Sequence, residues 1–159
     1  MRNLLLVWCI AAILPSCAGS KQNKASAIGL MPLNNYFVKN TVPLPEEYNY
    51  KVIAGQAEFD ALFGAAATMS NTIRQPDFSV QTVVAVMGKT SAQQQEIILD
   101  GATMTGKDMQ VYYRVKKGAS QSSAVTALAL ATVPKAISVK QVSFFQDSLL
   151  VKTVPVNIY

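Results

Sequence analysis

Residues 55–88 constrain the fold of this chain more than any other part of the sequence. The first part of this stretch places apolar side chains at positions i, i+3, i+4 and i+7, the spacing of one face of an amphipathic helix. These side chains belong to Phe59, Leu62, Phe63 and Ala66. The last part contains the apolar run VVAV, which is typical of a strand buried on both faces. The stretch therefore predicts a helix over residues 56–67 packed on a sheet, with residues 80–87 as a central strand.

Most of the chain after residue 88 has the patterns of short strands. Residues 109–116 alternate, so that Val111, Tyr113 and Val115 share one face. Further strands are predicted at residues 48–54, 94–103, 124–133, 136–142 and 148–154, with turns or polar loops at residues 100–101, 105–108, 118–123 and 147. These patterns predict an α+β fold, in which one β-rich domain has an antiparallel, sandwich-like sheet arrangement and a single amphipathic helix packed on it.

The N-terminus has the parts of a bacterial lipoprotein signal. A short cationic segment with Arg2 precedes an apolar run over residues 4–13, which suits a signal peptide and is too short to cross a bilayer as a helix. The next residues, Leu14-Pro15-Ser16-Cys17, resemble a lipobox, whose cysteine sulfur receives a diacylglycerol group. We therefore expect a signal peptide at residues 1–16, lipidation of Cys17, a small and polar tether over residues 17–27, and one globular domain over residues 28–159.

An alternative interpretation is a conventional signal peptide cleaved near Ala18 or Ser20, which leaves Cys17 without a role. A lipid on Cys17 would instead hold the protein on a membrane without a transmembrane helix. The tether lacks the acidic run that some surface-exposed lipoproteins carry after the cysteine. The expected location is therefore the cell envelope, most simply the outer membrane, with the domain facing the periplasm rather than the cell surface.

The sequence lacks the side chains on which most catalytic and metal sites depend. It has no histidine, and both cysteines, Cys9 and Cys17, precede the expected domain. Metal binding would rest on two acidic pairs, Glu46/Glu47 and Glu58/Asp60, and no calcium-binding loop or glycine-rich phosphate loop is present. We therefore expect a protein without catalytic residues, metal or cofactor.

An enzyme remains possible on two further arrangements of residues. One is a Ser-Lys dyad, formed by Ser91 with Lys89 or by Ser138 with Lys140. The other is a pocket that gathers Arg74, Asp77 and Lys89, although Asp77 is also expected to cap a turn. Three-dimensional proximity of these side chains would favour an enzyme.

The charge pattern argues against nucleic-acid binding. Removal of a signal peptide containing Arg2 leaves 13 basic and 9 acidic side chains, a net charge of +4. The basic residues are scattered, and Lys116-Lys117 is the only adjacent pair after the tether. A nucleic-acid surface normally needs a denser basic patch with aromatic side chains between the charges.

Four aromatic residues are candidates for a binding surface. Tyr36 and Phe37 lie in a segment between asparagines, which is expected to be extended and docked at the edge of the domain, and Tyr112 and Tyr113 lie in the alternating strand. Together they could supply stacking surfaces for a glycan or another small ligand, or a patch for a partner protein.

Several motifs resemble the PrcB C-terminal domain family, over about two thirds of the chain. They are an extended Val52-Ile53, a helix of the form x-E-F-D-x-L-F, the triplet D-F-S leading into V-V-A-V, and a closing P-x-x-h-x-V pattern. The segment NYFVKN at residues 35–40 and Phe63-Gly64-x-Ala66 are similar to versions found in lipoproteins of gut-type Bacteroidetes. The resemblance implies an exported lipoprotein, and it implies kinship with an accessory subunit that helps a cell-surface protease complex mature or persist.

One loop departs from the pattern of this family. Members usually carry a Pro-Thr-Gly-Gly-Tyr-like loop after the central strand, similar to loops of some secreted protease inhibitors. Here the corresponding segment, without the glycine pair or the tyrosine, is Gly88, Lys89, Thr90, Ser91, Ala92 and Gln93. We expect this segment to be a partner-binding loop. The leading hypothesis is a lipid-anchored, non-enzymatic protein that binds another envelope protein, such as a protease or its complex, and the alternative is a module that binds a small ligand or glycan.

Overall fold

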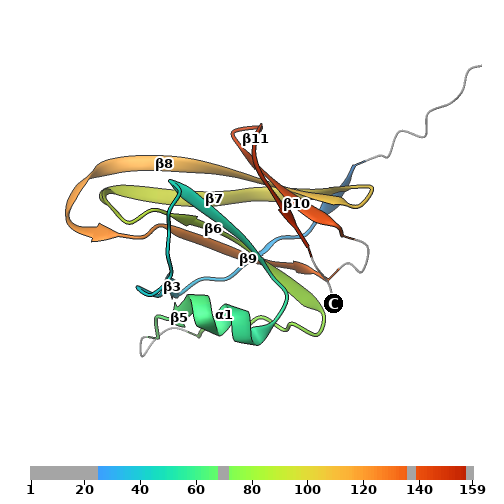
Figure 1. The fold of residues 1–159 in the computed structure, drawn as a ribbon, viewed down its shortest axis with the longest axis horizontal. Coiled ribbons are helices and arrows are strands. Elements are labelled where there is room, and N and C mark those ends of the chain that lie inside the picture. The colour runs from blue at the N-terminus through green and yellow to red at the C-terminus, as the bar shows by residue number, and fades with distance from the viewer. Residues whose placement is uncertain (1–24, 68–71, 136–138, 157–159) are drawn as a thin grey trace, which may run out of the picture.

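The computed structural model describes residues 25–67, 72–135 and 139–156, which form eleven strands and one helix (Figure 1). The elements in chain order are β1 (Ser26–Ile28), β2 (Met31–Pro32), β3 (Tyr36–Val38), β4 (Tyr48–Ile53), α1 (Gln56–Leu62), β5 (Phe63–Ala65), β6 (Gln81–Gly88), β7 (Ser91–Thr105), β8 (Asp108–Val125), β9 (Leu128–Pro134), β10 (Gln141–Gln146) and β11 (Leu149–Pro155). Cys17 and Ser138 lie outside the described residues. None of the helical residues described here makes a segment long and apolar enough to cross a membrane.

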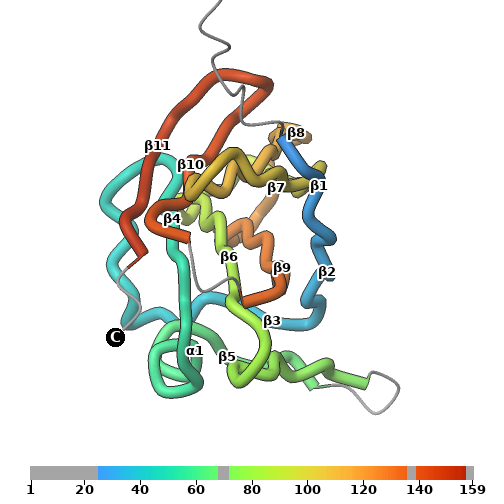
Figure 2. Tube along the Cα trace, turned by 90° about the vertical axis from the view of Figure 1, so that its right-hand side faces the viewer, coloured from blue at the N-terminus to red at the C-terminus, as the bar shows by residue number. Residues whose placement is uncertain are grey.

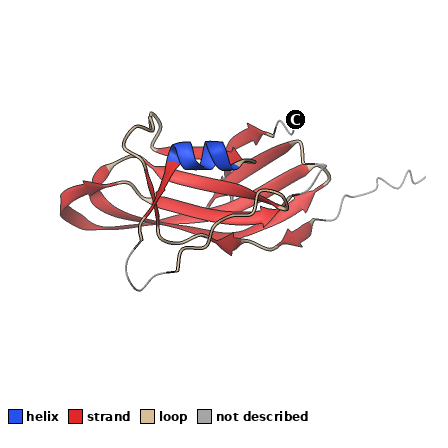
Figure 3. Ribbon diagram, turned by 90° about the horizontal axis from the view of Figure 1, so that it is seen from below, coloured by secondary structure: helices blue, strands red, loops and turns tan. Residues whose placement is uncertain are grey.

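Two sheets pack face to face, and a third layer covers one of them (Figure 2). The first, sheet A, has the order β1-β7-β8-β10-β11, and the second, sheet B, has the order β2-β9-β6-β4. The third layer consists of α1 and the small β3-β5 sheet, which lie across the outer face of sheet B (Figure 3). This arrangement confirms the predicted α+β, sandwich-like fold with one packed helix.

The central strand β6 carries both hydrophobic cores. Its side chains alternate, so that Val84 and Val86 join the core between the two sheets, while Val83, Ala85 and Met87 join the core under the helix. All five are at most 1% exposed. The prediction of a central strand buried on both faces is therefore confirmed, because a strand covered on both sides needs apolar residues at every position.

Sheet A is mixed rather than purely antiparallel. Strands β7 and β8 form a long hairpin that turns at Gly106, whose φ of 64° favours glycine. Strands β8 and β10, in contrast, pair in parallel, with Gln146 opposite Tyr113. The intervening strand β9 lies in sheet B, so the chain crosses to the other sheet and back, and it re-enters sheet A in the same direction.

The helix is shorter than the periodicity predicts. It ends at Leu62, and Phe63 takes an extended conformation that begins β5. The backbone of Phe63 pairs with Val38, and Gly64 lies directly under the ring of Phe37. Ala66, expected on the helix face, therefore lies beyond the helix. Glycine is a poor helix former, and pairing with β3 offers the chain backbone hydrogen bonds that compensate for the lost turn.

The β7–β8 hairpin is longer than predicted. Residues 118–123, expected as a polar loop, belong to β8, and Asp100-Gly101, expected as a turn, is a bulge within β7 where the register shifts. The turn at residues 105–108 and the turn containing Asp147 are confirmed, since Gly106-Lys107 and Asp147-Ser148 connect their strands. Of the strand predicted over residues 136–142, only Gln141 and Val142 lie in β10, and residues 136–138 lie outside the described residues.

Candidate functional site

The predicted partner-binding segment is mostly regular strand. Gly88 ends β6, and Ser91, Ala92 and Gln93 begin β7, so that Lys89 and Thr90 alone connect the two strands. The hydroxyl groups of Thr90 and Thr126 lie 2.7 Å apart, and the Lys89 amide donates to the Glu47 carbonyl at 2.8 Å. The expectation of a six-residue loop is therefore wrong, because β7 pairs with the extended end of β8. The short connection lies beside Glu47.

The four predicted aromatic residues do not form one surface. Tyr36 packs on Phe59 in the helix layer, with ring centroids 5.2 Å apart, and Phe37 is half exposed above Gly64. Tyr113 is 1% exposed in the core between the sheets. Tyr112 is its neighbour in the strand, so it points to the outer face of sheet A, where it stacks on Phe145. Tyr112 and Tyr113 therefore lie on opposite faces of sheet A, and Tyr36 and Phe37 lie in the separate layer that contains β3, so the four residues do not form the expected patch.

The three residues considered for an enzyme pocket, Arg74, Asp77 and Lys89, are not brought together. Asp77 precedes β6 and Lys89 follows it, so the eight residues of this strand lie between them. The Arg74 guanidinium donates to the Met31 sulfur rather than to Asp77. The Asp77 carboxylate accepts from the hydroxyl and amide of Ser79, and these hydrogen bonds lower the pKa of Asp77. Asp77 therefore caps a turn, as predicted.

The acidic pairs do not gather as a metal site. Each glutamate of the Glu46/Glu47 pair contacts a lysine, and Asp60 accepts a hydrogen bond from Gln56. Across residues 25–67, 72–135 and 139–156, no three side chains of the ligating types come together.

A polar opening lies where β8 continues past the end of β10. Strand β10 ends at Gln146 opposite Tyr113, so no other described strand pairs with Val115 and Lys117 of β8 on that side. They face β4 across a cleft of about 590 Å³. We call it the tyrosine cleft, and its walls consist of Glu46, Glu47, Tyr48, Tyr50, Val115, Lys117, Gln146 and Val151.

A chain of hydrogen bonds fixes the inner wall of the tyrosine cleft. The hydroxyl oxygens of Tyr50 and Tyr113 lie 2.6 Å apart, and the Tyr113 hydroxyl donates to Oε1 of Gln146 at 3.0 Å. Burial raises the pKa of Tyr113 far above its ordinary value, and burial also raises the pKa of Tyr50. Both phenols therefore stay protonated at physiological pH and act as hydrogen-bonding groups.

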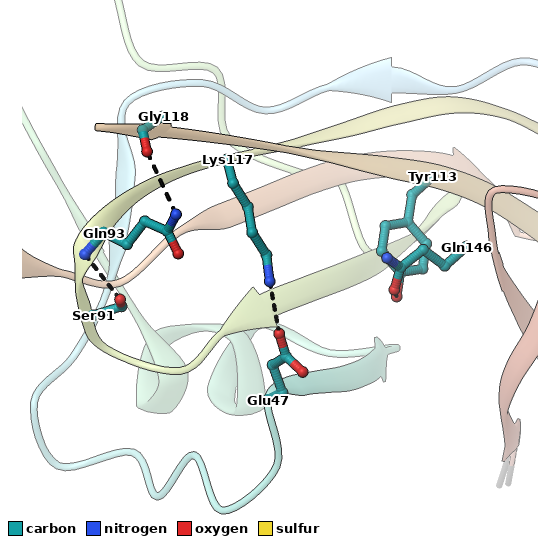
Figure 4. A network of polar contacts seen from close by, with 7 residues as sticks. All are labelled: Glu47, Ser91, Gln93, Tyr113, Lys117, Gly118 and Gln146. Atoms are coloured by element: carbon teal, nitrogen blue, oxygen red, sulfur yellow. Dashed lines mark hydrogen bonds and ion pairs between the residues drawn. The ribbon is translucent and has the colours of Figure 1, made fainter. Parts of the chain in front are cut away.

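Two ion pairs stand at the mouth of the tyrosine cleft. The Lys117 ammonium lies 3.3 Å from Glu47, and the Lys152 ammonium lies 3.0 Å from Glu46. Figure 4 shows the Lys117–Glu47 pair, with Tyr113 and Gln146 on one side and the start of the hairpin, Ser91 and Gln93, on the other. All four charged side chains are at least 43% exposed, so these pairs add little stability and can rearrange around a bound molecule.

Tyr48 gives the tyrosine cleft an unsatisfied polar group. The residue is 8% exposed, and no described group hydrogen-bonds to its buried hydroxyl. Burial raises the pKa of Tyr48, with Lys117 opposing and Glu47 adding to that effect.

The sequence interpretation missed this cleft. The segment YNYKVI was correctly predicted as a strand, and Tyr48, Tyr50 and Val52 alternate within it, so an aromatic face could have been noticed. The opposing residues Tyr113 and Gln146, however, come from strands whose parallel pairing leaves no local signal.

A second exposed feature adjoins the tyrosine cleft. Strand β11 ends sheet A, and its first residues Leu149, Leu150 and Val151 are 72%, 58% and 43% exposed. They follow the Asp147-Ser148 turn of the β10–β11 hairpin, which projects at the top of Figure 1. We call these three residues the apolar edge.

Comparison of the chain with models of protein families, with curated proteins and with solved structures found no match in any of the three.

Proposed function

We propose that this chain is a lipid-anchored, non-enzymatic protein of the bacterial cell envelope that binds another envelope protein. The resemblance in the sequence favours a protease or a protease complex as the partner, which the chain would stabilise as an accessory subunit. The lipobox-like Leu14-Pro15-Ser16-Cys17 supports the anchor. The apolar edge is the observation that supports binding of a partner protein.

The apolar edge has the pattern of a strand that belongs inside a sheet. Leu149 pairs with Gln146 and Leu150 pairs with Phe145, so these two side chains lie on opposite faces of β11, while Val151 is the unpaired residue of a β-bulge and lines the tyrosine cleft. Strands with apolar side chains on both faces are normally covered on both faces. Here all three side chains are exposed, which supports a partner that covers them.

The backbone of β11 offers the means of attachment. β11 is the last strand of sheet A, and no other described strand pairs with its outer edge. Free N–H and C=O groups at such an edge can pair with an extended segment of another protein. Lysine and proline normally protect edge strands from pairing with another chain, and Lys152 and Pro155 lie in the later half of β11. Leu149 and Leu150 precede these residues and the β-bulge at Val151, so a partner strand would pair with the start of β11.

The test is capture of a partner from detergent-solubilised envelopes with the tagged full chain and two variants. Leu150→Glu places a charge in the apolar edge, while Val80→Glu places the same charge at a residue of similar exposure, 59%, at the opposite end of β6 from the tyrosine cleft. We expect one defined protein to be captured by the wild type and by Val80→Glu, and to be lost from Leu150→Glu.

A partner retained equally by both variants, or no partner for the wild type across several detergents, would contradict the proposal. Circular dichroism of each variant shows whether it is folded. If Leu150→Glu does not fold, Leu149→Glu serves instead, since Leu149 is 72% exposed and lies next to the hairpin turn.

A further inference from the structure

The hydrogen-bond directions at the inner wall leave free groups on Tyr50 and Gln146, two residues that line the tyrosine cleft. Oε1 of Gln146 can only accept, so the Tyr113 hydroxyl must donate its proton there, and the Tyr50 hydroxyl must then donate to Tyr113. The Tyr50 oxygen keeps a free lone pair, and the Gln146 amide keeps two N–H donors. The wall thus offers both acceptors and donors, all on uncharged side chains.

Each glutamate that lines the tyrosine cleft is paired with a lysine, and Lys152 lies outside the lining. Glu46 pairs with Lys152, and Glu47 pairs with Lys117. An anionic or cationic ligand would therefore meet an opposite and a like charge together, with no net attraction. A neutral ligand with hydroxyl groups could instead donate to the carboxylates and accept from the ammonium of Lys117, which are charge-assisted hydrogen bonds.

The remaining surface of the tyrosine cleft is aromatic and aliphatic. Tyr48 is buried and Tyr50 is half-buried on the same face of β4, so Tyr50 supplies the aromatic surface, and Val115 and Val151 also line the opening. The faces of aromatic rings carry negative charge density and attract the weakly positive C–H faces of a ligand. The volume of about 590 Å³ lies within the range of known small-molecule sites, about 300–1,000 Å³.

We propose that the tyrosine cleft binds a neutral saccharide of one or two sugar rings. A sugar combines the three properties that the cleft requires: many hydroxyl groups, no net charge and an apolar C–H face. The proposal goes beyond protein binding at the apolar edge, and it rests on Tyr50, Gln146 and Glu47 rather than on Leu149 or Leu150.

The test measures binding of defined probes by calorimetry to the full chain, purified in a detergent without a sugar headgroup. The neutral probes are the methyl glycosides of glucose, galactose, mannose and N-acetylglucosamine, and the disaccharides maltose, lactose and chitobiose. The charged probes are glucosamine, glucuronic acid and inorganic phosphate. We expect at least one neutral probe to bind at millimolar concentration or below, and more tightly than any charged probe.

Two variants test whether the bound probe lies in the tyrosine cleft. Tyr50→Phe keeps the ring and removes the hydroxyl, and Glu47→Gln removes an acceptor charge, so each should weaken binding about three- to tenfold. Tyr112→Phe is the matched control, because its hydroxyl also donates to a glutamine, Gln110, at 2.8 Å but lies on the outer face of sheet A. This control should bind the probe as the wild type does.

Three results would overturn the proposal: no neutral probe bound by the folded wild type, tighter binding of a charged probe, or equal binding by Tyr50→Phe, Glu47→Gln and Tyr112→Phe. Leu150→Glu separates the two proposals. It should lose the protein partner and keep the saccharide, so failure of one proposal leaves the other measurable.

Discussion

The hydroxyl groups of Tyr50 and Tyr113 lie 2.6 Å apart and connect the edge strand β4 of sheet B to β8 in the middle of sheet A. Their rings also contact each other, with centroids 6.0 Å apart, and Tyr50 packs on Phe144 at 5.0 Å. Tyr113 is buried in the core and Tyr50 lines the tyrosine cleft, so this pair connects the core to the wall of the cleft. A change at either residue is therefore expected to affect stability as well as binding.

The first prediction concerns stability at high pH. Burial raises the pKa of Tyr113 above the value of about 10 that tyrosine has in an unfolded chain. Above about pH 10 the unfolded chain releases this proton while the folded chain keeps it, so the free energy of unfolding falls with rising pH. Tyr113→Phe removes the ionisable group. Its free energy of unfolding, measured by urea denaturation between about pH 9 and 11, should fall less than that of the wild type.

The free energy of unfolding of Tyr113→Phe should still fall with rising pH, because burial raises the pKa values of Tyr48 and Tyr50 as well. Tyr112→Phe, on the opposite face of β8, should retain the decline of the wild type. An equal decline in Tyr113→Phe and the wild type would contradict the assignment of this effect to Tyr113.

The second prediction concerns the helix layer. Phe59 is 1% exposed and packs its ring against Tyr36, Phe63 and Phe78, with centroids 5.2–5.8 Å apart. Phe59→Ala should lower the free energy of unfolding by about 3–5 kcal/mol, because it leaves a cavity between α1 and sheet B. Urea denaturation followed by circular dichroism measures the change.

Phe37→Ala is the control for this prediction. Phe37 is 49% exposed, so its loss should cost less than about 1 kcal/mol. If Phe59→Ala cost no more than Phe37→Ala, the helix layer would contribute little to the stability of the domain.

The parts of the fold that could be predicted are those in which a local pattern reports burial. The apolar run at residues 83–86 and the alternation around Val111 and Tyr113 report burial in this way, and both strands are confirmed. The helix was found for the same reason. Its end was misplaced because Phe63 fits the apolar helix face, while its pairing with Val38 depends on a distant segment.

The long hairpin and the tyrosine cleft could not be predicted in this way. Residues 118–123 contain three serines and one glycine and have the composition of a loop, but Ser120 pairs with Gln93 of β7. The cleft depends on the different lengths of β8 and β10 and on their parallel register. Neither property is encoded within a short window of sequence.

The last prediction concerns the membrane anchor. If the sulfur of Cys17 carries a diacylglycerol group, burial of its acyl chains holds the protein on the membrane, at about 0.8 kcal/mol per buried CH₂ group. Cys17→Ala should therefore move the protein from the membrane pellet to the soluble fraction after cell breakage and ultracentrifugation. Cys9→Ala is the matched control, since Cys9 lies within the apolar run of the signal, and it should leave the protein in the pellet.

Mass spectrometry of the N-terminal peptide should find the lipid on Cys17 in the wild type and in Cys9→Ala. A soluble wild-type protein with an N-terminus at Ala18 or beyond would instead identify conventional cleavage, and a Cys17→Ala protein that stays in the pellet would show that something other than this lipid holds it there.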